Sequence, residues 1–159
     1  MTAGRPRNAI VDPADLPGGA NTDYPDPFRA AVERREKRKL GDAVGLTNFG
    51  VNLVRLPPGA ASTQRHWHSK QDEFVYVLEG EIVLLTDAGE QVLSAGMCAG
   101  FPAGSGDGHQ LLNRSGRDAR YLEVGDRTPD DEVDYPDIDL LVRWIDGVER
   151  YVHKDGTPY

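Results

Sequence analysis

Residues 66–80 of the chain read HWHSKQDEFVYVLEG. The first and third of these residues, His66 and His68, point to the same face of an extended strand, with their Cα atoms about 6.5 Å apart. Two imidazoles on one wall can share a metal ion, although a lone His-x-His on a surface strand is often incidental. The residues that follow therefore decide how this pair is interpreted.

Glu73 opens the apolar run that ends at Leu78, five residues after His68. An odd offset would place it on the wrong face of a straight strand, but residues 69–72 have the composition of a turn, which resets the alternation. A carboxylate at an inward position is costly to bury unless it is paired or bound to a metal. Two interpretations stay open at this point: a metal ligand, or an ion pair with Arg55 or Arg65.

A third histidine, His109, follows the glycine-rich segment 96–108 and opens another short apolar run. The chain has four histidines, and three of them fall within residues 66–109, while His153 lies far away in the tail. The pattern predicts one metal site made by His66, His68, Glu73 and His109.

Short apolar runs separated by turn residues continue on both sides of this stretch. Many short strands at a spacing of about ten residues indicate a β-sandwich or a β-barrel. Asp146-Gly147, between the last two runs, favours a hairpin there. The predicted strands are 48–56, 73–78, 81–86, 91–93, 109–113, 119–124, 140–145 and 148–153.

The first 45 residues have a different character. Residues 1–26 are rich in proline, glycine and aspartate, which favours a loosely ordered arm. Asp26 as cap, Pro27 at the first position and Gly41 as stop predict one short solvated helix over residues 27–40. We expect an arm and helix in 1–45, a barrel in 46–127, and an acidic segment with a hairpin packing on the barrel in 128–159.

The strand 73–78 is apolar on both faces, which is unusual for the wall of a small barrel. Something must then cover its outer side. The arm, the C-terminal hairpin or a second subunit could do so, and we expect a homodimer.

Bulk properties exclude several classes of function. The formal charge of −8 over 159 residues argues against a nucleic-acid partner, and the apolar runs are far too short to cross a membrane. Residues 1–7 lack the apolar core of a secretory signal, and the single cysteine, Cys98, cannot form an internal disulfide. The sequence therefore predicts a cytoplasmic protein, and its acidic tail is interpreted as solvated surface.

Two motifs together resemble the cupin superfamily. The first is formed by Gly59, His66, His68, Glu73 and Gly80, and the second by Gly96, Pro102, Gly104, His109 and Asn113. The chain departs from the common pattern by one extra residue before His66 and two extra residues before His109. Residues 72–80, 101–104 and 125–127 further resemble a bacterial single-domain subfamily.

The resemblance implies an all-β jelly-roll barrel, here with an N-terminal arm and one short helix. It also implies that His66, His68, Glu73 and His109 hold one divalent transition-metal ion per chain, namely Fe, Mn, Ni, Co or Zn. Such a donor set leaves open positions on the ion, so we expect an anionic or chelating small-molecule ligand.

Cupins perform oxygenase, isomerase and lyase chemistry, so the resemblance implies a metal-dependent enzyme acting on a small oxygenated or anionic metabolite. A non-catalytic ligand-binding or sensing cupin is the alternative, and a structural or storage role is a third hypothesis. The sequence identifies no catalytic residue. Candidates whose other interpretation is packing or ordinary loop chemistry are Tyr76, Tyr121, Glu123 and Asp107 as acid or base, Cys98 as nucleophile, and Arg55 and Arg65 as an anion clamp.

Overall fold

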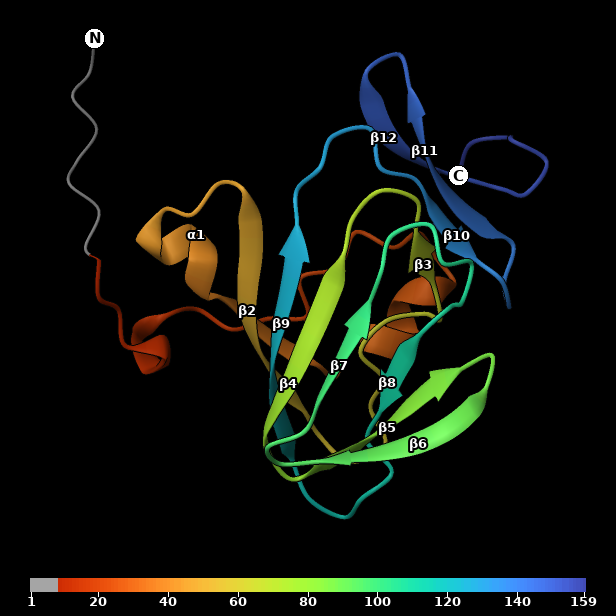
Figure 1. The fold of residues 1–159 in the computed structure, drawn as a ribbon. Helices are drawn as coiled ribbons and strands as arrows, with labels where there is room; N and C mark the ends of the chain where they lie inside the picture. Colours follow the sequence, from red (N-terminus) through yellow and green to blue (C-terminus); the bar gives the residue numbers. More distant parts are fainter. Residues whose placement is uncertain (1–8) are drawn as a thin grey trace, which may run out of the picture.

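The computed structural model describes residues 9–159, and the first part of the predicted arm, residues 1–8, lies outside the described residues. Three antiparallel sheets form a jelly-roll barrel with a C-terminal extension (Figure 1). The strands are β1 (Glu36–Lys39), β2 (Phe49–Leu56), β3 (Trp67–His68), β4 (Glu73–Glu79), β5 (Glu81–Thr86), β6 (Gly89–Ser94), β7 (Cys98–Phe101), β8 (Gln110–Leu112), β9 (Ala119–Asp126), β10 (Val133–Tyr135), β11 (Leu140–Ile145) and β12 (Val148–Val152).

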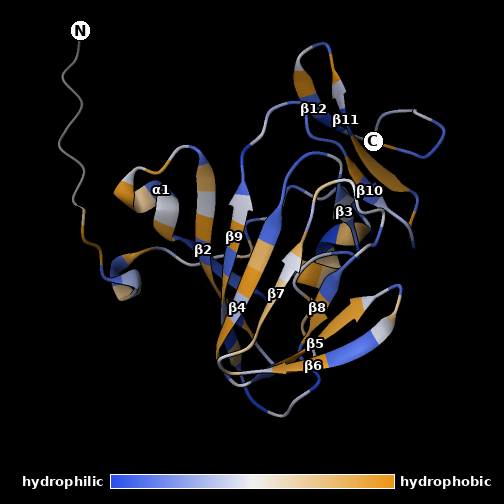
Figure 2. Cartoon of the chain, in the orientation of Figure 1, coloured by the Kyte–Doolittle hydropathy of each residue, from blue (hydrophilic) through white to orange (hydrophobic). Residues whose placement is uncertain are grey.

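The largest sheet has the strand order β1-β2-β9-β4-β7 and faces the three-stranded sheet β6-β5-β8 across the main core. Fully buried Leu56, Val77, Ile82 and Tyr121 fill the space between them. Burying a side chain of this size contributes about 1.5–3 kcal/mol. Figure 2 shows the hydropathy of these strands: β4 and β5 are coloured mostly as hydrophobic, and β6 carries a hydrophilic stretch.

The third sheet joins the C-terminal segment to the barrel through the order β12-β11-β10-β3. Its strand β10 pairs with β3, the strand that carries His68. A second core of Tyr24, Val32, Tyr135, Leu140 and Val142 lies beneath it. The expected hairpin is present as β11 and β12, with Asp146 and Gly147 at the turn, both at positive φ.

The short helix is present, but not where the sequence predicts it. The prediction of a helix over residues 27–40 is wrong: that segment forms a 3-10 turn at Phe28–Val32 and then strand β1. The α-helix, α1, spans Leu40–Val44 and includes Gly41, the expected stop. Strand β1 forms because its backbone pairs with β2, with Glu36 opposite Arg55 and Lys39 opposite Asn52. Such tertiary pairing overrides the weak local preference of a charged segment.

No helix among residues 9–159 is long and apolar enough to cross a membrane.

The outer face of β4 is uncovered in the described part of the chain. Phe74, Tyr76 and Leu78 are 41%, 39% and 42% exposed. Neither residues 9–26 of the arm nor the C-terminal hairpin therefore buries them. A second subunit stays the prediction for this face.

We expect sedimentation equilibrium to give a dimer for the wild-type protein and a monomer for Tyr76→Glu, because a carboxylate in an apolar contact is left unpaired. Val92→Glu is the matched control, since Val92 is 55% exposed on β6, away from this face. A wild-type protein that is monomeric at every accessible concentration would contradict the prediction.

Candidate metal centre

Backbone hydrogen bonds bring His66 and His109 together. The two residues form an antiparallel bridge, in which His109 N donates to His66 O at 2.8 Å and His66 N donates to His109 O at 3.2 Å. His68 lies two residues further on, in β3, and shares the inward face with His66. All three imidazoles consequently stand on one wall of the barrel.

Glu73 approaches from the opposite sheet as the first residue of β4, where it pairs with Phe101 of β7 and Gly125 of β9. Its side chain points inward together with the buried side chains of Val75 and Val77. The turn expected at residues 69–72 therefore resets the alternation as predicted.

The three imidazoles converge on one oxygen of Glu73. Glu73 Oε2 lies 3.5 Å from His66 Nε2, 3.4 Å from His68 Nε2 and 2.9 Å from His109 Nε2. This oxygen is buried, and no donor in residues 9–159 is oriented to hydrogen-bond to it. One ligand atom each from His66, His68 and Glu73 lies within 4.8 Å of the others. A buried carboxylate oxygen without a donor, faced by imidazole nitrogens, fits a cation between them.

The outer nitrogens of the histidines show how the rings are oriented. His66 Nδ1 lies 2.9 Å from the carbonyl oxygen of Gln64, and His68 Nδ1 lies 2.5 Å from Asp131 Oδ2. Both contacts place the proton on Nδ1 and leave the Nε2 lone pair free for a metal. His109 Nδ1 has no such partner in the described chain, but its ring stacks on Phe101 at 3.7 Å with an interplanar angle of 3°.

The charges of the cluster also match the needs of a metal site. Burial would raise the pKa of Glu73, but the imidazoles of His109 and His66 outweigh it and hold that pKa well below its ordinary value. Burial lowers the pKa of His109, whereas the carboxylate of Glu73 overcomes burial at His66 and raises its pKa. An ionised Glu73 and a neutral His109 are the forms that bind a metal.

Two cavities meet at the cluster. An inner one of about 20 Å³, room for one water, is lined by His66, His109, Glu73 and Glu123 among others. An outer one of about 330 Å³ extends from Glu73 along the inner face of the large sheet, a size typical of small-ligand sites. Its other lining residues are Asn21, Lys37, Lys39, Asp42, Gly50, Asn52, Gln71, Glu123, Gly125, Asp126 and Arg127.

The outer cavity exists because two cross-strand partners beside Glu73 lack side chains. Gly50 of β2 pairs with Gly125 of β9, which in turn pairs with Glu73. A methyl group at Gly125 would come 3.8 Å from Glu73 Cγ, and one at Gly50 would come 3.7 Å from Arg127 Nη2. The glycines thus leave the approach to Glu73 open.

Most of the weaker candidates lie elsewhere. Arg55 pairs with Asp118 and Glu36, and Arg65 pairs with Asp137 and Asp87, so neither pairs with Glu73 or faces the site as an anion clamp. Tyr76 is on the outer face, and Tyr121 is fully buried in the core. Asp107 accepts from the backbone nitrogen of Asp87, and Cys98 is exposed rather than packed in the interior.

Glu123 is the exception, because it lines both cavities next to Glu73. One of its oxygens, Oε1, accepts from Lys37 Nζ at 2.7 Å and from Asn52 Nδ2 at 3.0 Å. Burial would raise the pKa of Glu123, but the charge of Lys37 outweighs burial and lowers it. An ionised carboxylate therefore faces the space beside the cluster.

Sequence reasoning missed the residues that surround the ligands. Asp131 is buried and also accepts from the backbone nitrogen of Lys70 at 2.7 Å, so it ties His68 to the following turn. Tyr135 stacks on His66 with ring centroids 5.7 Å apart. Both belong to the acidic tail, and the interpretation of that tail as solvated surface fails at Asp131. No local signal points to it, because its partner lies 63 residues earlier.

Comparisons with known proteins agree with this geometry. The model of the cupin domain matches residues 52–125. A sugar phosphate isomerase of the cupin superfamily from Silicibacter pomeroyi is 45% identical, with a TM-score of 0.89 over 94% of this chain and 96% of its own. A candidate sugar phosphate isomerase from Acidithiobacillus ferrooxidans is 31% identical, with a TM-score of 0.73 over 82% of each chain.

A more distant structure supports the fold alone. The polyketide cyclase RemF from Streptomyces resistomycificus is 23% identical, with a TM-score of 0.63 over 77% of this chain and 82% of its own. No curated protein matches the sequence. The family match, together with the close likeness of nearly the whole chain to a cupin structure, means that this protein belongs to the cupin superfamily.

Proposed function

We propose that the chain is a metal-dependent isomerase of a sugar phosphate or a closely similar small metabolite. The observation that carries the proposal is the convergence of three imidazoles on Glu73 Oε2, a buried oxygen with no donor in residues 9–159. His66, His68, Glu73 and His109 would hold one divalent ion, chosen from Fe, Mn, Ni, Co and Zn. When bound, such an ion polarises a carbonyl or hydroxyl oxygen of the ligand.

The substrate class is supported by two similar proteins and by the cavity. The relative that is 45% identical over nearly the whole chain is named a sugar phosphate isomerase, and the one at 31% identity is a candidate for the same activity. The outer cavity of about 330 Å³ opens directly at Glu73 and is lined almost entirely by polar and charged groups. A polyhydroxylated anion suits that lining better than an apolar ligand does.

Proton transfer between neighbouring carbons requires a base beside the metal centre. Glu123 takes this part in the proposal, because Lys37 and Asn52 hold one of its oxygens and orient the carboxylate towards the cavity. The small inner cavity admits little more than a water, so the substrate is confined to the outer one.

The test is turnover without oxygen. Protein loaded separately with each of the five metals is incubated under nitrogen with aldose and ketose phosphates, and the products are followed by NMR. We expect interconversion of the two forms with at least one metal, no dependence on oxygen, and loss of activity after chelation.

Each other outcome identifies an alternative. Activity that requires oxygen would replace the isomerase by an oxygenase, and cleavage of the substrate would replace it by a lyase. Saturable binding of a sugar phosphate without turnover would favour the non-catalytic ligand-binding protein.

A further inference from the structure

Most charged groups around the outer cavity already have partners. Glu123 pairs with Lys37, and Asp42 pairs with Arg127. Asp126 accepts from the backbone nitrogens of Asp72 and Thr128, at 3.0 Å and 2.7 Å. These contacts leave little free charge for recognising a ligand.

Lys39 is different. It is the exposed last residue of β1, and its ammonium group forms no ion pair or hydrogen bond within residues 9–159. Lys37, two residues earlier on the same strand, reaches Glu123 on the inner face, so Lys39 shares that face. Among the described residues, Lys39 is therefore the one cation of the outer cavity that has no ion-pair partner.

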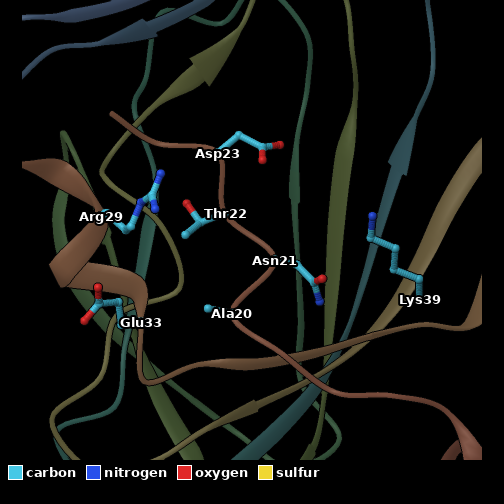
Figure 3. Close-up of a pocket in the computed structure, with 7 residues that line it drawn as sticks. All are labelled: Ala20, Asn21, Thr22, Asp23, Arg29, Glu33 and Lys39. Carbon is cyan, nitrogen blue, oxygen red and sulfur yellow. The ribbon is translucent and has the colours of Figure 1, made fainter. Parts of the chain in front are cut away.

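Figure 3 shows the surroundings of Lys39 on the side of the N-terminal arm. The arm segment 20–23 passes between Lys39 on one side and Arg29 and Glu33 on the other. These residues line a separate cavity of about 410 Å³ that contains none of the three clustered histidines. Lys39 lines both this cavity and the outer cavity that reaches Glu73.

The strand pairing gives the separation between Lys39 and the candidate metal centre. Lys39 pairs with Asn52, Asn52 with Glu123, and Glu123 with Val75, two residues from Glu73. Three strand spacings across the sheet and two residues along β4 amount to about 16 Å between the backbones of Lys39 and Glu73. Both residues line the cavity, and the five bonds from Cα to Nζ allow the lysine side chain to span about 6 Å of this separation. The phosphorus and the first carbon of an extended six-carbon sugar phosphate are about 9 Å apart, at roughly 1.25 Å per bond.

We propose that Lys39 binds the phosphate group of the substrate, which holds the sugar across the outer cavity with its opposite end at Glu73. This inference rests on the proposed function and adds a phosphate subsite to it. A lysine serves such a role as a point charge on a flexible stem, so it tolerates the small differences between phosphorylated sugars. Specificity then comes from length: a sugar too short to reach from Lys39 to the metal end is bound but poorly converted.

The test compares Lys39→Met with the wild type, both fully loaded with metal. Calorimetric titrations use erythrose 4-phosphate, ribose 5-phosphate, glucose 6-phosphate and unphosphorylated glucose as probes. Loss of a charged hydrogen bond should weaken binding of the best phosphorylated probe about tenfold or more and leave binding of glucose unchanged. Added salt should weaken binding by the wild type and have less effect on the variant.

Arg117→Gln removes the same charge from an exposed loop outside the cavity and is the matched control. Equal affinity of Lys39→Met and wild type for every phosphorylated probe would overturn the phosphate subsite, as would wild-type protein that binds none of them. The metal content is measured in the same samples. If Lys39→Met keeps its metal, its turnover and its affinity for the phosphorylated probes, the phosphate subsite is refuted and the proposed function is not. A wild-type protein that binds no metal would refute the proposed function itself.

Discussion

Replacing His109 by alanine is expected to abolish stable metal binding, with a loss of affinity greater than about 100-fold. Removing a group that only orients a metal ligand lowers metal affinity by up to about 100-fold, whereas His109 would bind the ion directly. Its Nε2 lies nearest to Glu73 Oε2 of the three histidines, at 2.9 Å. Elemental analysis of the purified variant checks the prediction, with one ion per wild-type chain as the reference.

His153→Ala is the control for this experiment, because His153 bonds to Asp139 in the tail and lies outside the cluster. Circular dichroism should give the wild-type spectrum for both variants, since the backbone bridge between His66 and His109 does not require the imidazole. Wild-type metal content in His109→Ala would mean that His66, His68 and Glu73 suffice, and the four-ligand site would be wrong.

Replacing Asp131 by asparagine should weaken metal binding by about 10–100-fold. Asp131 Oδ2 accepts a hydrogen bond from His68 Nδ1 at 2.5 Å, which fixes the ring so that Nε2 faces the site. An asparagine of the same shape removes the negative charge that favours the Nδ1 proton and makes His68 a better ligand. Competition with a chromophoric chelator measures the change in affinity.

Asp130→Asn is matched to Asp131→Asn in charge and position. Asp130 is exposed and has φ of 57°, a conformation that asparagine adopts readily. Its affinity for metal should equal that of the wild type. If Asp131→Asn bound metal as tightly as Asp130→Asn, the orientation of His68 would not depend on Asp131.

The strands of the barrel could be predicted because alternation and turn residues are local signals. Strand β5 and the hairpin of β11 and β12 lie within one residue of their expected bounds. The spacing of His66 and His68 likewise indicates a shared face without knowledge of the fold. The role of Glu73 required one more inference, that the turn at residues 69–72 changes the parity of the strand.

The elements and residues that the sequence does not predict depend on partners far along the chain. The charged segment Glu36–Lys39 has no strand pattern of its own and becomes β1 only through β2. Strand β7 lies in the glycine-rich segment 96–108, where the sequence predicts no strand, and it forms through pairing with β4. Asp131 looks like any acid of the tail until β10 pairs with β3. Local composition carries no information about such contacts.

The predicted site residues are brought together by the structure, whereas their ability to hold a metal stays a proposal. Phosphate binding by Lys39 is likewise a proposal. It follows from the ion pairs that its neighbours form and not from its sequence context. Lys37 and Arg127 look equally suitable in the sequence, yet both are neutralised by carboxylates.

The central claim is that one ion is bound by four named side chains. An anomalous difference map from crystals of the metal-loaded protein, recorded at the absorption edge of the bound metal, tests it most directly. The account predicts one peak per chain at about 2.0–2.2 Å from Nε2 of His66, His68 and His109 and from an oxygen of Glu73. A peak elsewhere, or a peak that His109 does not contact, would contradict it.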